Sequence, residues 1–281
     1  MEVILCWNRE TKLSFYRYLT LYSLRKYNPK IDITLYLYDS NVNKEWEDDV
    51  KQDFQEYNGK DYLKEVEKLN IKIKDWKYQA IENATPSHKS NIFKWEMLSK
   101  NNCIYFDMDI LFLKDISKLI DLITQNTTLL CFENYLMIGV LGSNGKNSFF
   151  NSVYKNCNKV FNKNRYQTLG VENIYKLLYG GYAFYDNGSV DWNYILKSTM
   201  VEDIEKLFNT NVVNIPKTWF YKYDNNNIHK IYYNSDVDLT DMIGIHWYGG
   251  HVVSQKYNLI FTEEYIEKSD LFICKTIRGI L

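Results

Sequence analysis

Short apolar runs alternate with longer amphipathic stretches over the first 115 residues of the chain. Residues 2–7 and 31–38 are apolar or β-branched, which predicts two strands. Between them, residues 12–27 carry apolar side chains at near-helical spacing and stop before Asn28-Pro29, which predicts a helix. Strand–helix–strand alternation of this kind indicates an α/β fold with a largely parallel sheet flanked by helices.

The next elements continue the alternation. Residues 44–69 are charged and predict mostly helix, and residues 70–75 predict a short strand. Thr85-Pro86 puts an N-cap residue before a proline in the first helical position, so a helix is expected to begin there. The apolar run over residues 102–113 then predicts a buried strand.

Beyond residue 115 the alternation is less regular. Helices are predicted over residues 115–124, 146–163, 189–208 and 262–273 and from about 168 to a break at Gly180-Gly181, and strands over 127–132, 136–142, 212–221 and 242–247. The chain has three prolines and neither a Pro/Gly/Ser-rich linker nor an internal repeat, so a single domain over residues 1–281 is expected.

Composition narrows the function. Hydrophobic residues make up 46% and charged residues 25% of the chain, as in a packed globular protein. The formal net charge is −1 and the basic residues are interspersed with acids, which argues against a nucleic-acid partner. The 25 tyrosines and 7 tryptophans suit a sugar or base cleft, although biased codon usage is an alternative explanation.

The cysteines and the apolar runs indicate the cellular compartment and whether a membrane segment is expected. Five widely spaced cysteines without a Cys-x-x-Cys motif predict reduced, mostly buried thiols and a cytoplasmic location. The N-terminus lacks a signal-peptide pattern, and no apolar run is long enough for a transmembrane segment. Residues 273–281 are apolar and basic; they are expected to pack against the domain, with peripheral membrane contact as the alternative.

The first candidate site interrupts the apolar run over residues 102–113 with two carboxylates, Asp107 and Asp109. Buried ionised carboxylates are costly unless they are paired or hold a metal. In an extended segment residues i and i+2 point to the same side, so both side chains are expected to face one point. Such oxygen ligands suit Mg²⁺ or Mn²⁺, which commonly carry a substrate diphosphate. The alternative is that Asp-x-Asp is only a turn or a helix cap.

Two further observations support a site. Ligands of parallel α/β sheets bind at the carboxyl ends of strands, where Trp7-Asn8, Asp39 and the acidic pair all fall. Residues 242–251 read as a strand ending in His246, followed by two aromatic residues and two glycines. A neutral imidazole would complete an oxygen-rich metal shell, and the glycines would let backbone amides approach phosphate oxygens. A core histidine packed by aromatic residues is the alternative.

Together these segments resemble glycosyltransferases of the GT-A fold with a DxD sugar-binding region, family-32-like, as in bacterial capsule enzymes and homologues in large DNA viruses. The likeness is carried by residues 87–98 followed by 104–109, by Trp7 after the first strand, and by the His-Trp-Tyr-Gly-Gly element of residues 246–250. It covers roughly residues 1–115 and 242–251.

The resemblance implies metal-dependent transfer of a sugar from a UDP- or GDP-sugar to a glycan, a lipid or a protein-linked acceptor. It implies a nucleotide-binding half over residues 1–115 and an acceptor-side half over 116–281. The implied metal is Mn²⁺ or Mg²⁺, with Asp107, Asp109 and His246 as ligands. The residues implied in donor binding are Trp7, Asn8, Asp39, Lys89, Asn91, Lys94, Asp107, Trp247, Gly249 and Gly250.

The donor sugar and the stereochemistry stay open. Asn91 and Lys94 stand where family members often carry Asp and Arg, and Lys does not replace Arg in bidentate contacts. An inverting enzyme needs a carboxylate base for the acceptor hydroxyl, for which Asp186 and Asp191 are the candidates. The alternative is that these are a turn residue and a surface helix residue. The resemblance favours a retaining reaction.

Two other functions compete with the transferase. One is a nucleotide-sugar-binding protein without catalysis on a transferase scaffold, which the substitutions at Asn91 and Lys94 allow. The other is a phosphatase of the haloacid dehalogenase type, which also uses Asp-x-Asp after an apolar strand. Its aspartates lie near the N-terminus and precede Gly-Thr, whereas Ile110-Leu111 follows here.

Overall fold

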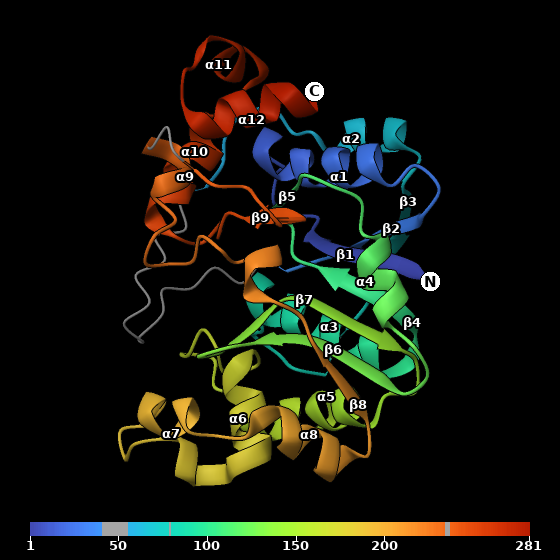
Figure 1. Cartoon of the computed structure of the whole chain (residues 1–281), viewed down its shortest axis with the longest axis vertical. Helices are drawn as coiled ribbons and strands as arrows, with labels where there is room; N and C mark the ends of the chain where they lie inside the picture. The colour runs from blue at the N-terminus through green and yellow to red at the C-terminus, as the bar shows by residue number, and fades with distance from the viewer. Residues whose placement is uncertain (41–55, 79, 234–236) are drawn as a thin grey trace.

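The computed structural model describes residues 1–40, 56–78, 80–233 and 237–281. A seven-stranded sheet with the strand order β3-β2-β1-β4-β7-β6-β8 lies at its centre, and β5 and β9 form a second, two-stranded sheet (Figure 1). The strands are β1 (Glu2–Asn8), β2 (Asp32–Tyr38), β3 (Lys72–Asp75), β4 (Asn102–Phe106), β5 (Ile110–Phe112), β6 (Thr127–Phe132), β7 (Leu136–Asn144), β8 (Asn211–Asn214) and β9 (Gly244–His246).

Most neighbouring strands of the large sheet are parallel. The pairs β1–β2, β1–β4, β2–β3 and β6–β8 are parallel, and the pairs β4–β7 and β6–β7 are antiparallel. The helices are α1 (Phe15–Tyr27), α2 (Leu63–Val66), α3 (Pro86–Lys100), α4 (Ser117–Leu122), α5 (Ser148–Val160), α6 (Val171–Tyr179), α7 (Trp192–Leu196), α8 (Met200–Phe208), α9 (Lys230–Tyr233), α10 (Val252–Ile260), α11 (Glu263–Lys268) and α12 (Phe272–Ile280), with 3₁₀ turns at Glu67–Leu69, Gly180–Ala183 and Lys217–Trp219. The predicted mixed α/β class with a mostly parallel sheet is confirmed.

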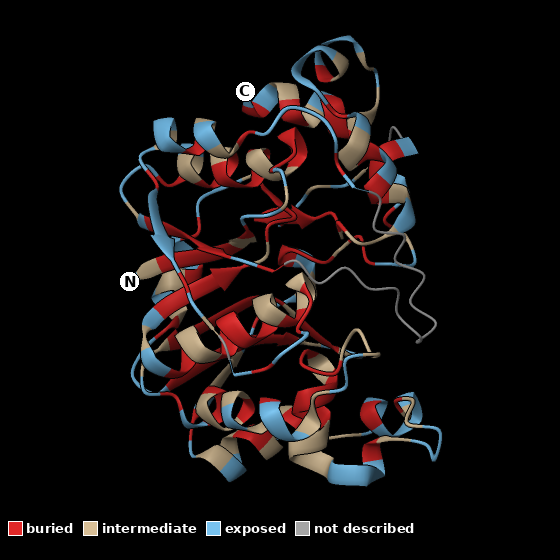
Figure 2. Ribbon diagram, turned by 180° about the vertical axis from the view of Figure 1, so that it is seen from behind, coloured by how far each residue is buried: buried red, intermediate tan, exposed pale blue. Residues whose placement is uncertain are grey.

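The two faces of the large sheet are covered by different helices. Successive side chains of a strand point to opposite faces, and in β4 this alternation is clean. Ile104 and Phe106 pack into the core on the α1 side, while Cys103 and Tyr105 pack into the core on the side of α3, α5 and α6. Figure 2 shows the central strands as the most continuously buried part of the molecule. Burial on both faces explains why these strands are apolar throughout rather than alternating with polar residues.

Helix α3 begins as predicted. The side chain of Thr85 accepts a hydrogen bond from the backbone N–H of His88, and Pro86 occupies the first turn. One face of the helix is buried against the sheet and α5. This face carries Lys94, and its side chain therefore lies beside Asp107, directly after β4.

The predicted strand over residues 102–113 is wrong in one respect. The chain forms β4, leaves the large sheet in a turn over 107–109, and re-enters extended structure as β5 in the other sheet. The two carboxylates therefore lie in a turn between the two sheets and not within a strand.

Other predicted boundaries also shift. The predicted helix over 189–208 is two helices, α7 and α8, with Lys197–Thr199 between them. The predicted strand over 212–221 ends with β8 and is followed by a 3₁₀ turn. Of the predicted helix over 44–69, residues 44–55 lie outside the described residues, and helical structure is present over 63–69.

The C-terminal region packs on the α1 side of the sheet. Helix α12 buries Ile273, Cys274, Ile277 and Ile280, which confirms packing of this segment against the rest of the protein. All five cysteines are buried and unpaired. Among the described residues, no helix combines the length and the apolar character needed to cross a membrane.

Candidate active site

Three side chains from distant parts of the sequence meet beside the turn that follows β4. Asp107 and Asp109 come from this turn, and His246 is the last residue of β9. Strands β5 and β9 are antiparallel, and their register places Ile110 opposite His246. The backbone N–H of Trp247 also donates to the carbonyl oxygen of Asp109, at 2.9 Å. The short sheet therefore delivers the histidine to the acidic pair.

The geometry of this triad suits a metal ion. One ligand atom from each of Asp107, Asp109 and His246 lies within 4.8 Å of the other two. Nε2 of His246 is 3.3 Å from Oδ1 of Asp109 and 3.7 Å from Oδ2 of Asp107. Oδ1 of Asp109 is buried without a hydrogen-bond partner in the described part of the chain. A buried carboxylate oxygen without a partner costs free energy that a cation would recover.

Asp107 is held in its ionised form by its neighbours. Its Oδ1 accepts hydrogen bonds from the hydroxyl of Tyr105 at 2.6 Å and from Nζ of Lys94 at 3.1 Å. Burial opposes ionisation, but Lys94, His246 and Tyr105 together hold the pKa of this carboxyl below its ordinary range. Lys94 itself is buried and also donates to the carbonyl oxygen of Ile138.

Asp109 is anchored from the opposite side. Its Oδ2 accepts a 2.6 Å hydrogen bond from the backbone N–H of Gly249 and lies 3.7 Å from the guanidinium of Arg17. The guanidinium is 4.7 Å from the centre of the Trp247 ring, which stacks on Tyr16 at 4.0 Å. Oδ1 is thereby left facing His246.

Two glycines leave room for these contacts. A Cβ atom at position 139 would lie 2.8 Å from Nε2 of His246 and 2.9 Å from Oδ2 of Asp107. A Cβ at position 249 would fall within 3 Å of the Arg17 guanidinium. A side chain at either position would displace these groups, and Gly139 therefore forms the back wall of the triad.

The other predicted donor-binding residues divide by environment. Asn8 is buried, and its amide group bonds both the backbone N–H and the carbonyl oxygen of Ser40, which fastens the end of β1 to the segment after β2. Trp7 is half-buried and donates to the carbonyl oxygen of Thr11 at 2.8 Å. Asp39 is exposed, and Nζ of Lys89 donates to its carbonyl oxygen.

The remaining predicted residues lie close to the triad or behind it. Asn91 is buried on α3, one turn before Lys94. Gly250 follows Gly249 in the turn after β9, and its carbonyl oxygen accepts from the side chain of Gln255. Trp247 is fully buried, so it supports Arg17 from within the core.

Asp186 and Asp191 lie in a different structural setting. Asp186 is exposed in a turn closed by hydrogen bonds between Tyr185 and both Gly188 and Ser189. Asp191 is the N-cap of α7, and its Oδ1 accepts from the backbone N–H groups of the first helical turn and from the hydroxyl of Tyr185. Both positions match the alternative given for them, a turn residue and a surface helix residue.

Arg17, Gly139 and Tyr105 were not predicted as site residues. Tyr105 precedes Asp107 by two positions, so the strand pattern offered a signal for it. Arg17 lies on α1 and Gly139 on β7, and their approach to the triad depends on tertiary packing that no local pattern reveals.

Comparison with known protein families agrees with this geometry. The family model described as glycosyl transferase family 8 matches residues 11–174, which include α3, the acidic turn and Gly139. This chain belongs to glycosyl transferase family 8. The match confirms the predicted glycosyltransferase with a DxD region, and it specifies family 8, whereas the sequence resemblance pointed to family-32-like enzymes. No curated protein sequence matches the chain.

Solved structures with a similar backbone are also glycosyltransferases. They include GlyE of Streptococcus pneumoniae TIGR4, with 11% identity, a TM-score of 0.46 and coverage of 99% of this chain and 60% of that one. The galactosyltransferase LgtC shows 12% identity, a TM-score of 0.44 and full coverage of both chains. An enzyme that glycosylates the major capsid of PBCV-1 shows 11% identity and a TM-score of 0.43, over 92% of this chain and 98% of that one. Because none of these TM-scores reaches 0.5, the family assignment stands on the sequence match.

Proposed function

We propose that this family 8 glycosyltransferase moves a sugar from a UDP- or GDP-sugar to a glycan, a lipid or a protein-linked acceptor. The proposal depends on a divalent cation, Mn²⁺ or Mg²⁺, held by Asp107, Asp109 and His246. The observation that carries it is the convergence of these three ligands around a buried carboxylate oxygen that has no other partner in the described chain. Two carboxylates and an imidazole are a donor set that such ions accept.

The charge balance of the site favours a diphosphate as the group that binds together with the metal ion. Lys94 and Arg17 each lie beside one of the two carboxylates, so the acidic pair is already compensated. Adding a divalent cation to this arrangement leaves an excess of positive charge, which the diphosphate of a donor would neutralise. Metal and nucleotide should therefore bind cooperatively, each raising the affinity of the other.

The chemistry that the cation supplies there is Lewis-acid stabilisation of the charge on the leaving diphosphate. The protein's own groups position the ligands. Gly249 donates its backbone N–H to Asp109, and Tyr105 and Lys94 fix Asp107. Lys94 and Arg17 also provide fixed positive charge beside the place where negative charge develops.

The structure gives less support for the acceptor half of the proposed reaction than for the donor half. A retaining reaction needs no carboxylate base from the protein, and the exposed turn position of Asp186 and the helix-capping role of Asp191 agree with that outcome. For an inverting reaction these two carboxylates remain the proposed bases. The apolar face of α12 is turned into the protein, so the proposed peripheral membrane contact gains no support from that helix.

The decisive experiment is a binding panel. UDP, GDP and their sugars are titrated by calorimetry and thermal shift with Mn²⁺, with Mg²⁺ and with a chelator, on the wild type and on Asp109→Asn. An Asp121→Asn variant on α4 serves as a control that keeps the triad. We expect one nucleotide to bind tightly only with metal, and metal alone to bind weakly.

Three outcomes are informative. Metal-dependent binding that is lost in Asp109→Asn and kept in Asp121→Asn supports the proposal and names the donor nucleotide. Nucleotide binding that is unchanged by chelator removes the metal from the proposal. Metal-dependent binding without sugar transfer to any acceptor would favour a binding protein without catalysis.

A further inference from the structure

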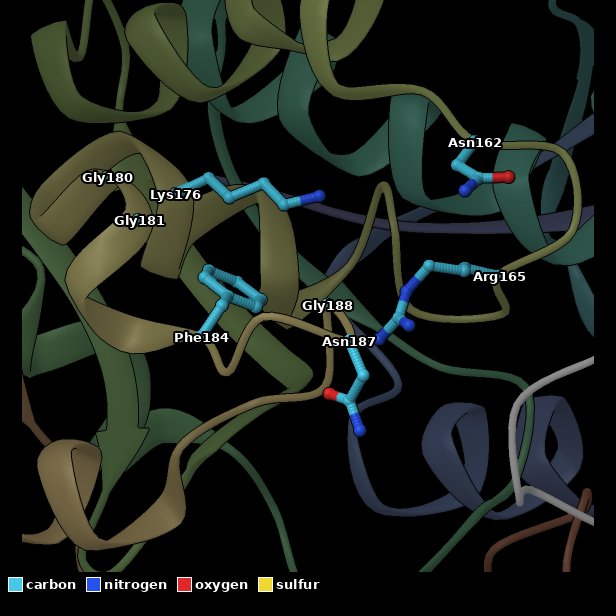
Figure 3. A pocket seen from close by; sticks show the side chains of 8 residues that line it. All are labelled: Asn162, Arg165, Lys176, Gly180, Gly181, Phe184, Asn187 and Gly188. Carbon is cyan, nitrogen blue, oxygen red and sulfur yellow. The ribbon is translucent and has the colours of Figure 1, made fainter.

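A hollow of ≈ 650 Å³ lies between the loop over residues 161–170 and the segment over residues 180–188 (Figure 3). None of the triad residues lines it. Its wall includes Lys176, Arg165 and Phe184 together with the amides of Asn162 and Asn187. The volume lies in the range that small-molecule sites occupy.

Two cationic side chains line the hollow. Figure 3 shows the ends of Lys176 and Arg165 extending into the same space from opposite sides. The Arg165 guanidinium is paired with Glu172 through two hydrogen bonds, of 2.6 and 3.1 Å. In the described part of the chain, no carboxylate lies within ion-pair distance of the Lys176 ammonium. Lys176 is thus a cation of the hollow without an ion pair among the described residues.

Lys176 is not simply a solvated surface lysine. It is half-buried, and its Nζ lies 5.3 Å from the centre of the Phe184 ring. Burial lowers the pKa of this ammonium and the Arg165 charge adds to the effect, while Glu172 opposes it. A half-buried cation held beside another cation is stabilised when an anion enters between them.

The rest of the wall suits a sugar. Phe184 offers a ring on which a pyranose can pack, and the two asparagines offer amides for hydroxyl groups. A Cβ atom at Gly180 or Gly181 would meet nothing within 4 Å, so the wall is open there. Asp186 is exposed and is not part of the lining, so its charge does not cancel that of Lys176.

Helix α3 connects this hollow to the triad. The carbonyl oxygen of Arg165 lies 2.9 Å from Nε2 of His88, on the first turn of α3. Lys94, which holds Asp107, is six residues further along the same helix, about 9 Å at the α-helical rise. A Cβ at Gly170, which ends the loop, would lie 3.2 Å from the Asn91 amide between them. Hollow and triad are therefore fixed to neighbouring turns of one helix.

We infer that this hollow is an acceptor subsite that binds the anionic group of an acidic sugar, either a carboxylate or a phosphate, between Lys176 and Arg165. The inference rests on the proposed transferase function, because it assigns the hollow to the second substrate. Neutral sugars lack the anionic group that the Lys176 ammonium attracts, and they should bind in the hollow more weakly.

The test compares matched methyl glycosides: a hexoside, the corresponding hexuronide and the corresponding 6-phosphate. Binding is measured by calorimetry on the full chain, without donor, for the wild type, Lys176→Gln and Lys155→Gln, an exposed lysine of α5. We expect the acidic glycosides to bind the wild type about tenfold more tightly than the neutral one. Lys176→Gln should remove this preference, and Lys155→Gln should keep it.

The outcomes separate this inference from the proposed function. Equal binding of acidic and neutral glycosides by the wild type, or a preference that survives Lys176→Gln, overturns the subsite. Absence of measurable binding by every acidic glycoside overturns it too. Metal-dependent nucleotide binding is measured on the same samples. Its absence from the wild type would count against the proposed function, whereas a Lys176-dependent preference for acidic glycosides would still support an acidic-sugar site in the hollow. The stronger of the two acidic glycosides identifies the group as carboxylate or phosphate.

Discussion

The triad after β4 and the hollow beside α6 are two charged sites that differ in how their charges are balanced. At the triad, two carboxylates are compensated by Lys94 and Arg17 and fixed by strands and buried aromatic rings. At the hollow, Lys176 has no ion pair among the described residues, and the lining comes largely from loops and exposed helix ends. The groups of the triad are held in one geometry by the protein itself, whereas Lys176 in the hollow would gain an oppositely charged partner when an anion binds. The difference is that expected between a site for a constant cofactor and one for a variable substrate.

The largest effect should come from Asp109→Asn. The substitution keeps the size of the side chain but removes a charged metal ligand, so transfer activity should fall roughly 10³-fold or more. Initial rates with the donor found in the binding panel measure the loss, and the melting temperature reports the fold. Activity within tenfold of the wild type would show that the triad is not the catalytic centre.

The next effect should come from Gly139→Ala, because the added methyl group would push against Nε2 of His246 and Oδ2 of Asp107. A displacement of this size is expected to cost on the order of 10²-fold in activity. Gly279→Ala on α12 is the matched control, since a Cβ there meets nothing within 4 Å. Steady-state kinetics of both variants decide the point, and equal activities would remove Gly139 from the wall of the triad.

The third prediction concerns stability and a carboxylate outside the triad, Asp224, whose charge is also compensated by a lysine. Asp224 is buried; its Oδ2 accepts from Lys217 at 2.8 Å and from the hydroxyl of Tyr135 at 3.2 Å. Burial opposes its ionisation, but Lys217, the backbone N–H of Asn226 and Tyr135 hold the pKa of Asp224 below its ordinary range. Asp224→Asn should therefore lower the free energy of unfolding at pH 7 by about 1–3 kcal/mol.

The pH dependence of that loss has a definite sign. Because the pKa is lower in the folded than in the unfolded protein, the ionised pair stabilises the fold above the unfolded pKa of about 3.9. This contribution disappears as the pH falls through the folded pKa. Urea unfolding of wild type and Asp224→Asn at pH 7, 5 and 3 should show a gap that narrows at the acidic end. A gap that widens toward acid would contradict the assignment.

The smallest effect should come from Asp191→Asn. Asparagine caps a helix about as well as aspartate, so α7 should keep its start and stability should change by less than about 0.5 kcal/mol. For a retaining enzyme, activity should change by no more than about threefold. A loss of the size expected for Asp109→Asn would instead make Asp191 the base of an inverting reaction, and Asp186→Asn tests the other candidate in the same way.

The sequence predicted the triad because its signals are local. The acidic pair interrupts an apolar run, and His246 ends a short apolar segment before two glycines. The start of α3 was predicted from Thr85 and Pro86 because capping depends on adjacent residues. The break between β4 and β5 was missed because an apolar run shows that residues are buried and does not show which sheet they join.

The hollow could not be predicted for a different reason. Lys176 and Arg165 are eleven positions apart and line the same hollow only through the packing of α6 with its preceding loop. Arg17 reaches Asp109 across more than ninety positions, and a Cβ atom at position 249 would displace its guanidinium. Contacts of this kind depend on packing between elements, and periodicity within one element carries no information about them.

The pairing of β5 with β9 has a consequence for biosynthesis. Within the described chain, the three residues of β5 have no neighbour in a sheet except β9, which is made 132 to 136 residues later. The large sheet is complete once residue 214 has been synthesised, but His246 and Gly249 follow it. A nascent chain on the ribosome would thus present a folded sheet with two carboxylates still lacking their third ligand. Competence to bind metal would arise only after residue 249 has been synthesised, which makes metal-dependent nucleotide binding an assay for the docking of β9 on β5.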